Sequence, residues 1–260
     1  MMKQYCVSFV GAGNVAMALC REMFNKGHFI DHITSRNEKN GRTLASSYHA
    51  TWSGDFVLPV TSEIIIVAVP DRNLSEVLKA IRCNNSSIVA HTAGSFGLDV
   101  FPPDLKNTGV FYPLQTFSVN RIPDISEVPF FIEASDEKSV NTLKSLAESI
   151  SHSVHVSDAD HRRLLHMAAV FVSNFTNHML TTGKNISSIA GVPFEELKPL
   201  ILETINKAME LGPENSQTGP AIRYDLNTIE KHLDLLSFAP DFKNVYEMIT
   251  KSIISYYKNN

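Results

Sequence analysis

A glycine-rich turn near the amino terminus constrains the fold more than any other feature of this chain. The apolar residues 5–9 have the composition of a strand, and a helical apolar period begins directly after the turn. Gly11 permits a tight turn, Gly13 leaves room for a pyrophosphate, and the small Ala16 lets the helix pack closely on the strand. Backbone N–H groups at a helix N-terminus bind phosphates. The turn therefore predicts a dinucleotide-binding loop that consists of Gly11, Ala12, Gly13, Asn14 and Val15.

The residues after the second apolar run indicate which dinucleotide binds. Residues 29–34 are predicted to form a strand that ends at Ser35 and Arg36, roughly 20 residues after the glycines, where NAD enzymes carry an acidic residue for the ribose 2′-hydroxyl. No carboxylate stands at this point, because Asp31 lies too early, inside the strand. A hydroxyl followed by a planar guanidinium suits a 2′-phosphate. Ser35 and Arg36 therefore predict NADP as the cofactor, with an exposed loop arginine as the alternative interpretation.

Composition and charge narrow the class of protein. The chain has 260 residues, 43% of them hydrophobic, which suits one substantial domain and a smaller second one. A net charge of −4 gives no excess of basic residues, so the charge does not predict binding to nucleic acid or to an anionic membrane. Cys6, Cys20 and Cys83 are scattered and odd in number, so we expect reduced thiols and a cytoplasmic location. The apolar run before Gly11 is too short for a signal peptide or a membrane span and is expected to be the first strand.

The order of apolar patterns predicts two domains. In residues 1–157, strand-like runs (64–69, 88–90, 110–112, 130–132, 154–156) alternate with helical stretches (73–82, 136–150), which predicts buried parallel strands flanked by helices. In residues 158–260, helical periods take over at 158–190, 193–211, 225–236 and 241–258. Ser157 and Asp158 can cap the first of these helices. The expected fold is α/β, a doubly wound Rossmann sheet followed by an all-α domain, with the ligand in the cleft between them.

Candidate ligand-binding residues follow three of the predicted strands, at the sheet edge where ligands bind in open α/β sheets. We expect four of them at the nicotinamide end of the cofactor: Val69, Pro70, His91 and Thr92. Tyr112 and Gln115, after a third run, are expected to contact the substrate. Ordinary turn formation is the alternative explanation, above all for Thr92.

The first long helix of the second half carries spaced polar residues on an apolar background. His166, Asn174 and His178 can face one side of a regular helix, with Asn174 and His178 one turn apart. Polar groups on an apolar helix need partners, so these three are predicted to be catalytic residues that face the substrate. A buried histidine that is satisfied by protein groups is the alternative for each ring.

A later loop adds two candidate residues. Gln217 and Arg223 lie among turn-forming residues between two predicted helices, and both are predicted to bind the substrate. Alternatively, Arg223 and Asp225 pair and cap a helix. The spacing of the histidines and cysteines predicts no metal site.

These motifs together resemble a known family. The segments GAGNVA, SR, AVPD, HTAGS, YPLQTF, HMAAVFVSNFTNH and QTGPAIRYD are similar to those of NADP oxidoreductases of the deazaflavin-dependent type, over nearly the whole chain. That family is in turn similar to pyrroline-5-carboxylate reductase and the 6-phosphogluconate dehydrogenase group. The resemblance implies NADP at residues 11–16 with Ser35 and Arg36, and a C-terminal domain like that of 6-phosphogluconate dehydrogenase, which dimerises. Val170 stands where the hydroxyacid dehydrogenases carry a catalytic lysine, so their alcohol oxidation is not implied.

The resulting hypothesis is an NADP-dependent oxidoreductase that moves a hydride between the cofactor and a small imine or carbonyl substrate. The protein would orient the substrate carbon over the nicotinamide, and His166 or His178 would exchange the proton. Asn174 and Gln217 would hold the substrate by hydrogen bonds. Two alternatives stay open: a nucleotide-binding sensor or scaffold without catalysis, and reduction of NADP by a deazaflavin. The C-terminal helices carry more apolar residues than a small bundle can bury, which predicts a homodimer.

Overall fold

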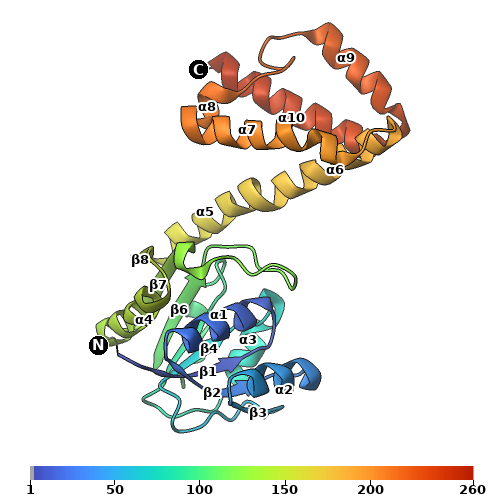
Figure 1. Cartoon of the computed structure of the whole chain (residues 1–260). Coiled ribbons are helices and arrows are strands. Elements are labelled where there is room, and N and C mark those ends of the chain that lie inside the picture. Colours follow the sequence, from blue (N-terminus) through green and yellow to red (C-terminus); the bar gives the residue numbers. More distant parts are fainter. Residues whose placement is uncertain (1–2, 260) are drawn as a thin grey trace. The chain divides into compact units, whose positions relative to one another are not determined.

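The apolar runs of the first half form one sheet. The structure, a computed structural model, describes residues 3–259 (Figure 1). Eight strands lie in the order β3-β2-β1-β4-β5-β6-β7-β8. Their bounds are β1 Cys6–Val10, β2 Phe29–Thr34, β3 Thr51–Ser53, β4 Ile64–Val67, β5 Ile88–His91, β6 Asn107–Pro113, β7 Phe130–Ala134 and β8 Val154–Val156. Every strand predicted from an apolar run is present, and the short β3 is an addition to the prediction.

One pair of strands departs from the predicted parallel arrangement. β6 and β7 pair antiparallel, whereas the other pairs in the sheet are parallel. The connection between them, residues 114–129, contains the short 3-10 helix η2 (Ile125–Glu127) and no crossover helix. Parallel neighbours need such a crossover, and antiparallel neighbours do not. The expectation of parallel pairing is therefore wrong for β6 and β7.

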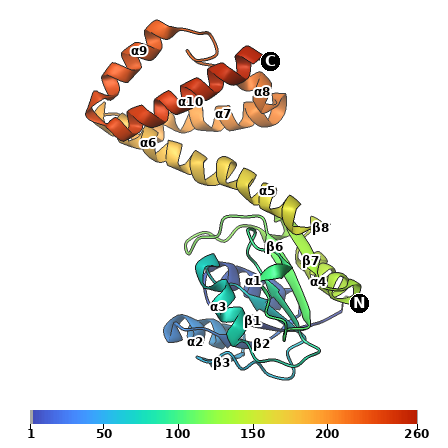
Figure 2. The ribbon, with the colours of Figure 1, turned by 180° about the vertical axis from the view of Figure 1, so that it is seen from behind.

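Helices cover both faces of the sheet. They are α1 (Asn14–Asn25), α2 (Glu38–Ser47), α3 (Asp71–Ala80) and α4 (Glu137–Ile150). One buried apolar cluster contains residues of α1, α2 and α4, and a second contains residues of α3. β4 contributes Ile64 and Ile66 to the first cluster and Ile65 and Val67 to the second, because side chains alternate across a strand. Figures 1 and 2 show these helices from opposite sides, and they confirm the doubly wound α/β arrangement.

The second half is helical, as predicted. Its elements are α5 Ala159–Ala169, the π-helix Val170–Phe175, α6 Thr176–Ile189, η4 Phe194–Leu197, α7 Lys198–Leu211, α8 Pro213–Ser216, α9 Leu226–Leu235, η5 Leu236–Phe238 and α10 Pro240–Asn259. Asp158 caps α5, since its carboxylate accepts a hydrogen bond from the backbone N–H of His161 at 2.9 Å. The predicted cap at the start of the first long helix is thereby confirmed.

The π-helix interrupts what the apolar period predicts as one regular helix. A π-helical turn contains more residues than an α-helical turn, so it shifts the faces of the helix that follow it. His166, Asn174 and His178 would face one side only of a helix with 3.6 residues per turn throughout. The prediction of such a regular helix is wrong across Val170–Phe175, which contains Asn174.

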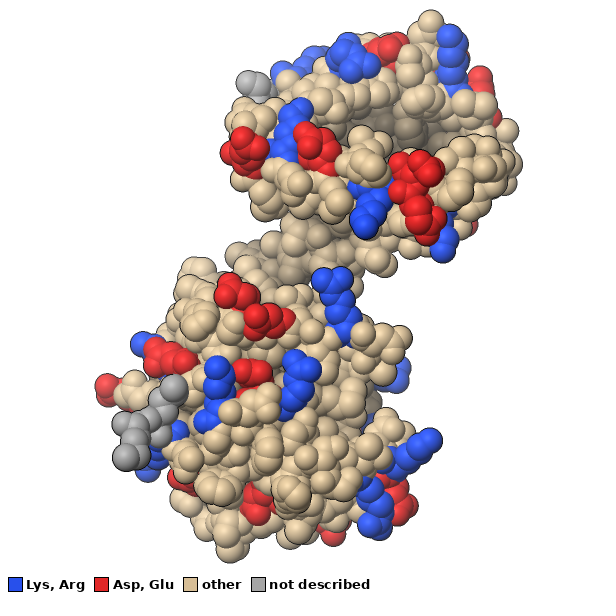
Figure 3. Space-filling view, viewed as in Figure 1, with Lys and Arg blue, Asp and Glu red and all other residues tan. Residues whose placement is uncertain are grey.

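Contacts divide the chain into two compact units, Met1–Asn174 and Phe175–Asn260. The last strand ends at Val156 and the first long helix begins at Ala159. The division into a cofactor domain, 1–157, and a helical substrate domain, 158–260, stays a prediction. In residues 3–259, no helix is both long and apolar enough to cross a membrane. Acidic and basic side chains are interspersed on the face of each unit that Figure 3 shows.

Candidate cofactor and substrate site

The two glycines of the first turn are required for different reasons. Gly11 has a φ of +114°, and a Cβ at this position would overlap the backbone carbonyl of Ala68 at the end of β4. Gly13 has extended backbone, and a Cβ there would meet no atom within 4 Å. The fold itself therefore demands glycine at position 11. At position 13 the space is open, and only a bound group would make a side chain unacceptable.

A cavity of about 260 Å³ opens at this turn, beside the carboxyl ends of β1, β2 and β4. The predicted cofactor residues that line it are Gly11, Ala12, Gly13, Ser35, Arg36, Val69 and Pro70. The lining residues that the sequence analysis missed are Val10, Thr34, Asn37, Asn40, Phe56, Ala68 and Val77. Asn37 carries a recognisable signal, because it caps α2 and its side chain accepts from the backbone N–H of Asn40 at 3.0 Å.

Ser35 and Arg36 have different surroundings although they are adjacent. The Ser35 side chain is buried, its hydroxyl donates to the backbone carbonyl of Asn37 at 2.9 Å, and it accepts from the indole N–H of Trp52 at 3.2 Å. Arg36 is exposed at the cavity. The hydroxyl of Ser35 is therefore used to hold the loop, and Arg36 is the group available to a phosphate.

Asn14 and Val15, also predicted to bind the cofactor, lie at the start of α1 and are not among the cavity-lining residues. The side-chain amide of Asn14 donates to the backbone carbonyl of Phe117 at 3.2 Å, which ties the segment after β6 to the glycine turn. Val15 packs against the core. Their backbone N–H groups at the helix start are the part of them that suits a phosphate.

His91 lies at the carboxyl end of β5, as predicted, but it is not among the residues that line the cofactor cavity. Its side chain is fully buried, Nδ1 accepts from the backbone N–H of Ala93 at 3.2 Å, and Nε2 lies 3.4 Å from the carbonyl of Gly97. Burial lowers its pKa to about 4, so the ring is neutral. The His91 ring therefore holds the loop after β5, and its contact with the cofactor stays a prediction. Thr92 is half-buried beside it, and its backbone N–H donates to Val67.

Tyr112 and His166 form a hydrogen-bonded pair at the carboxyl end of the sheet. The Tyr112 hydroxyl at the end of β6 lies 3.1 Å from Nδ1 of His166 on α5, and the rings meet edge to face. Gly94 allows this contact, because a Cβ there would lie 2.7 Å from the Tyr112 ring and 2.9 Å from the same His166 nitrogen. Burial, and to a lesser degree the carboxylate of Asp71, raises the pKa of Tyr112, so its phenol stays protonated at neutral pH.

Asp71 and Ser95 adjoin this pair. The Ser95 hydroxyl donates to the Asp71 carboxylate at 2.5 Å, which joins the loop after β5 to the first residue of α3. Asp71 directly follows Pro70, which lines the cofactor cavity. Asp71 ends the AVPD segment and Ser95 ends the HTAGS segment, and neither was among the predicted site residues. The structure thus brings a carboxylate, two hydroxyls and an imidazole to the ends of β4, β5 and β6.

The remaining predicted residues are exposed or half-buried, and their roles stay predictions. Asn174 ends the first unit and His178 lies on α6 in the second, and both are exposed. The side chain of Gln115 accepts from the backbone N–H of Thr116. Gln217 donates to the carbonyl of Thr218 at 2.9 Å, in the loop between α8 and α9.

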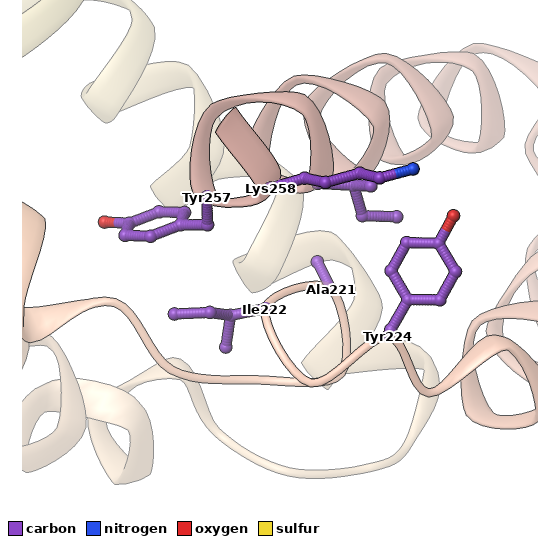
Figure 4. Close-up of a pocket in the computed structure, with 6 residues that line it drawn as sticks. Ala221, Ile222, Tyr224, Tyr257 and Lys258 are labelled. Carbon is purple, nitrogen blue, oxygen red and sulfur yellow. The ribbon is translucent and has the colours of Figure 1, made fainter. Parts of the chain in front are cut away.

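Arg223 follows in the same loop, next to a separate pocket of the second unit. Figure 4 shows this pocket, where Tyr257 and Lys258 of α10 face Ala221, Ile222 and Tyr224. Arg223 is exposed and is not among the lining residues. Asp225 caps α9 through a hydrogen bond from the backbone N–H of Thr228 at 3.1 Å, which confirms the capping part of the alternative interpretation. Among the ion pairs of residues 3–259, none joins Asp225 to Arg223.

Comparisons with known proteins agree with this geometry. Residues 6–94 match the domain family described as NADP oxidoreductase, coenzyme F420-dependent, and residues 128–253 match DUF2520, a domain of unknown function. A solved structure of BF3122 from Bacteroides fragilis, described as a putative NADP oxidoreductase, is 37% identical. The match covers 98% of this chain and 100% of that one, with a TM-score of 0.89. The chain belongs to this family of NADP oxidoreductases. NADP is therefore the cofactor of its family, as the glycine turn and Arg36 predict.

More distant solved structures share the fold. The reductive aminase of Aspergillus terreus, in complex with NADPH and ethyl-5-oxohexanoate, is 12% identical with a TM-score of 0.71, over 98% of this chain and 100% of that one. The pyrroline-5-carboxylate reductase of Streptococcus pyogenes is 12% identical with a TM-score of 0.62, over 97% and 99% of the two chains. A search of the curated proteins finds no match.

Proposed function

We propose that this protein is an NADP-dependent oxidoreductase that transfers a hydride between NADP(H) and a small imine or carbonyl substrate. The observation that carries the proposal is the Tyr112–His166 pair, whose hydroxyl and ring nitrogen are 3.1 Å apart. The pair lies in the same unit as the cofactor cavity and at the same edge of the sheet. A hydride transfer to C=N or C=O needs one proton besides the hydride, and such a pair can supply it.

The residues of the cavity fit a bound dinucleotide. The N-terminus of α1 and the open space at Gly13 suit the pyrophosphate, and the exposed guanidinium of Arg36 suits a 2′-phosphate. Val69 and Pro70 line the cavity toward Asp71 and are proposed to contact the nicotinamide end. When bound there, NADPH supplies the hydride, and the protein supplies orientation and the proton.

The pair has a defined direction of proton movement during reduction. With its proton on Nδ1, His166 donates to the Tyr112 hydroxyl, whose own O–H is then free to donate to the substrate nitrogen or oxygen. Because the pKa of Tyr112 is raised, the phenol does not lose its proton to water at neutral pH. His166 is half-buried, and its other ring nitrogen, Nε2, takes up a proton from solvent as Nδ1 gives one up, so the ring stays neutral.

Five further residues are proposed to hold or orient the substrate, on the strength of their positions in the sequence motifs. They are Gln115, Asn174, His178, Gln217 and Arg223. If Asn174 and His178 contact substrate, Asn174→Ala and His178→Ala each lower turnover about tenfold or more while NADPH affinity changes little. A lower melting temperature with unchanged specific activity of the folded fraction would instead make them structural.

We also propose a cytoplasmic homodimer. Many large apolar side chains of the helices are exposed, with Met209 at 77%, Met248 at 73% and Leu235 at 71%. A second copy is the simplest cover for them. The cytoplasmic location rests on the three cysteines, which are all unpaired thiols.

The experiment that tests the function is NADPH oxidation with a panel of small imines, ketones and 2-oxo acids, together with NADPH titration. Tyr112→Phe and His166→Gln should each lower kcat about 100-fold or more, the typical share of general acid catalysis, while NADPH still binds. Glu148→Gln, at an exposed position of α4, is the matched control and should leave kcat and NADPH binding unchanged. NADPH binding without oxidation of any panel member would overturn the proposal, and in favour of a nucleotide sensor if the deazaflavin described below is not turned over either.

The domain match to the coenzyme F420-dependent family favours a second candidate reaction, hydride exchange between NADP and a deazaflavin. The same preparation, incubated with NADP and reduced deazaflavin, distinguishes the two. Recovery of the oxidised deazaflavin absorbance at a catalytic rate would make the deazaflavin the substrate. No change in absorbance, with an active imine or ketone panel, would leave the first proposal standing.

A further inference from the structure

Near the Tyr112–His166 pair, the arginines have acidic partners but the carboxylate of Asp71 has no basic partner. What this implies about the substrate rests on the function proposed above. Asp71 is an exposed carboxylate whose hydrogen-bond partner is the Ser95 hydroxyl, and no ion pair within residues 3–259 includes it. The Ser95 bond points the carboxylate toward the loop that contains Gly94, against which Tyr112 and His166 pack. A negative charge without a counter-ion therefore adjoins the pair that would face the substrate.

The arginines beside the same loop are paired with acids. Arg162 is buried, with Nη1 2.7 Å from the Glu133 carboxylate. Arg163 donates to the backbone carbonyl of Ser95 at 3.2 Å, and two carboxylates flank it, those of Asp160 at 3.2 Å and Asp99 at 3.5 Å. Neither guanidinium is free to bind a substrate carboxylate.

Two other arginines, Arg72 and Arg223, do not neutralise Asp71 either. Arg72 follows Asp71 on α3, but successive residues of a helix point about 100° apart, so a helix that directs Asp71 at Ser95 directs Arg72 elsewhere. Arg223 of the second unit lies near Asp225 and helps to lower the pKa of that carboxyl, after the hydrogen bonds from Thr228. Arg162 also acts on Tyr112 from the same unit, but Glu133 neutralises it, so the unpaired charge beside the pair is that of Asp71.

We propose that the substrate is a cationic iminium, or the amine formed from it, that lacks a carboxylate group, and that Asp71 holds its charged nitrogen. A carboxylate favours a cation beside it and disfavours a second carboxylate. Ser95 orients Asp71 by donating to one oxygen, which leaves the other free to accept from an N–H of the substrate. The Asp71 carboxylate, which has no counter-ion, would disfavour a 2-oxo acid or an imino acid at this place.

The reaction balances with these groups. In reduction, the C=N carbon receives a hydride with its two electrons from NADPH, and the π electron pair of C=N moves to nitrogen. The iminium forms when the neutral imine takes one proton from the Tyr112 hydroxyl, which His166 restores, and Asp71 then holds the charged nitrogen. The products are the neutral amine and NADP⁺.

The test compares two cyclic imines that differ only in a carboxylate: 1-pyrroline, and 1-pyrroline carrying a ring carboxylate. We expect kcat/KM with NADPH to be at least about tenfold higher for the ring without carboxylate, a factor that corresponds to one modest charge interaction. Asp71→Asn should remove most of this discrimination. Glu76→Gln removes the same charge from an exposed position of α3 and should leave it unchanged. Arg72→Gln should also leave it unchanged.

A binding measurement keeps the inference separable from the proposed function. In calorimetry of the protein saturated with NADP⁺, pyrrolidine should bind more tightly than the same ring carrying a carboxylate, and Asp71→Asn should weaken pyrrolidine selectively. A preference for the ring that carries a carboxylate, in either assay, overturns the inference while the oxidoreductase proposal stands. Loss of the expected preference for the ring without carboxylate in Arg72→Gln also overturns it. Binding of pyrrolidine without NADPH oxidation by any imine or ketone would overturn the proposed reaction and support the amine site.

Discussion

The guanidinium of Arg162 lies 2.7 Å from the carboxylate of Glu133, and its side chain is fully buried. The same guanidinium donates to the backbone carbonyl of Phe96 at 2.6 Å and lies 3.4 Å from that of Asp158. It thereby joins the first turn of α5 to β7 and to the loop after β5. His166 lies one turn further along α5, so the position of the proposed proton donor depends on this buried ion pair.

Removing one member of the pair should be costly. Arg162→Met leaves the partly buried Glu133 carboxylate, whose side chain is 19% exposed, without a counter-ion. We expect a loss of about 3 kcal/mol in the free energy of unfolding, the lower end of the range for a buried pair, measured by urea denaturation. Glu133→Gln should cost less, because Arg162 keeps its backbone acceptors. Glu148→Gln, which removes the exposed pair with Lys144, should cost below about 1 kcal/mol. Equal effects of the buried and exposed changes would contradict the role assigned to Arg162.

The two glycines of the first turn should respond differently to substitution. Gly13→Val should abolish NADPH binding while the melting temperature stays near that of the wild type, because the position is open in the fold. Gly11→Ala should unfold or strongly destabilise the protein, because of its positive φ and the nearby Ala68 carbonyl. Circular dichroism and fluorescence titration distinguish the two results. Normal NADPH binding by Gly13→Val would make the loop a structural turn only.

Arg36 should determine the preference for the phosphorylated cofactor. NADPH should bind more tightly than NADH, and Arg36→Ala should weaken NADPH by about 1.5–3 kcal/mol, the range for a hydrogen bond to a charged group, with little effect on NADH. Ser35→Ala should act mainly on stability, since its hydroxyl is used by Asn37 and Trp52. Equal affinities of the wild type for the two cofactors would refute the assignment.

His91 should make the protein less stable in acid. Its pKa is about 4 in the folded chain, against 6.5 for an unburied histidine, so between these pH values the unfolded chain binds a proton that the folded chain does not. The stabilisation is fully present above pH 6.5 and is lost as the pH falls toward 4, on the order of 3 kcal/mol in total. His91→Asn keeps an acceptor for Ala93 and should flatten the pH dependence of urea denaturation over this range. An unchanged slope would show that another group titrates.

The exposed apolar side chains of the helices predict a stable dimer. Light scattering at micromolar concentration should give twice the monomer mass. Met209→Glu or Met248→Glu, at positions 77% and 73% exposed, should shift the mass toward the monomer without unfolding either unit. A monomer mass for the wild type would exclude this prediction.

Local patterns in the sequence were sufficient to predict much of the fold. The apolar runs predicted seven of the eight strands, since apolar, β-rich runs flanked by polar turns are typical of buried strands. Gly11, Ala12, Gly13 and Arg36 could be assigned to the cofactor cavity because the turn, the helix start and the end of β2 are close in sequence. The antiparallel β7 and the π-helix were missed, since neither strand direction nor a widened helical turn leaves a periodic signal.

The sequence by itself determined the order of elements, the glycine turn and the cap of α5 by Asp158, because each depends on residues within a few positions of one another. Only the tertiary structure decided that Tyr112 meets His166, that Ser95 bonds to Asp71, and that Arg162 supports the loop at Phe96. It also decided that His91 is buried. These contacts join residues that are tens of positions apart, and they form because the carboxyl ends of neighbouring strands converge at one edge of the sheet.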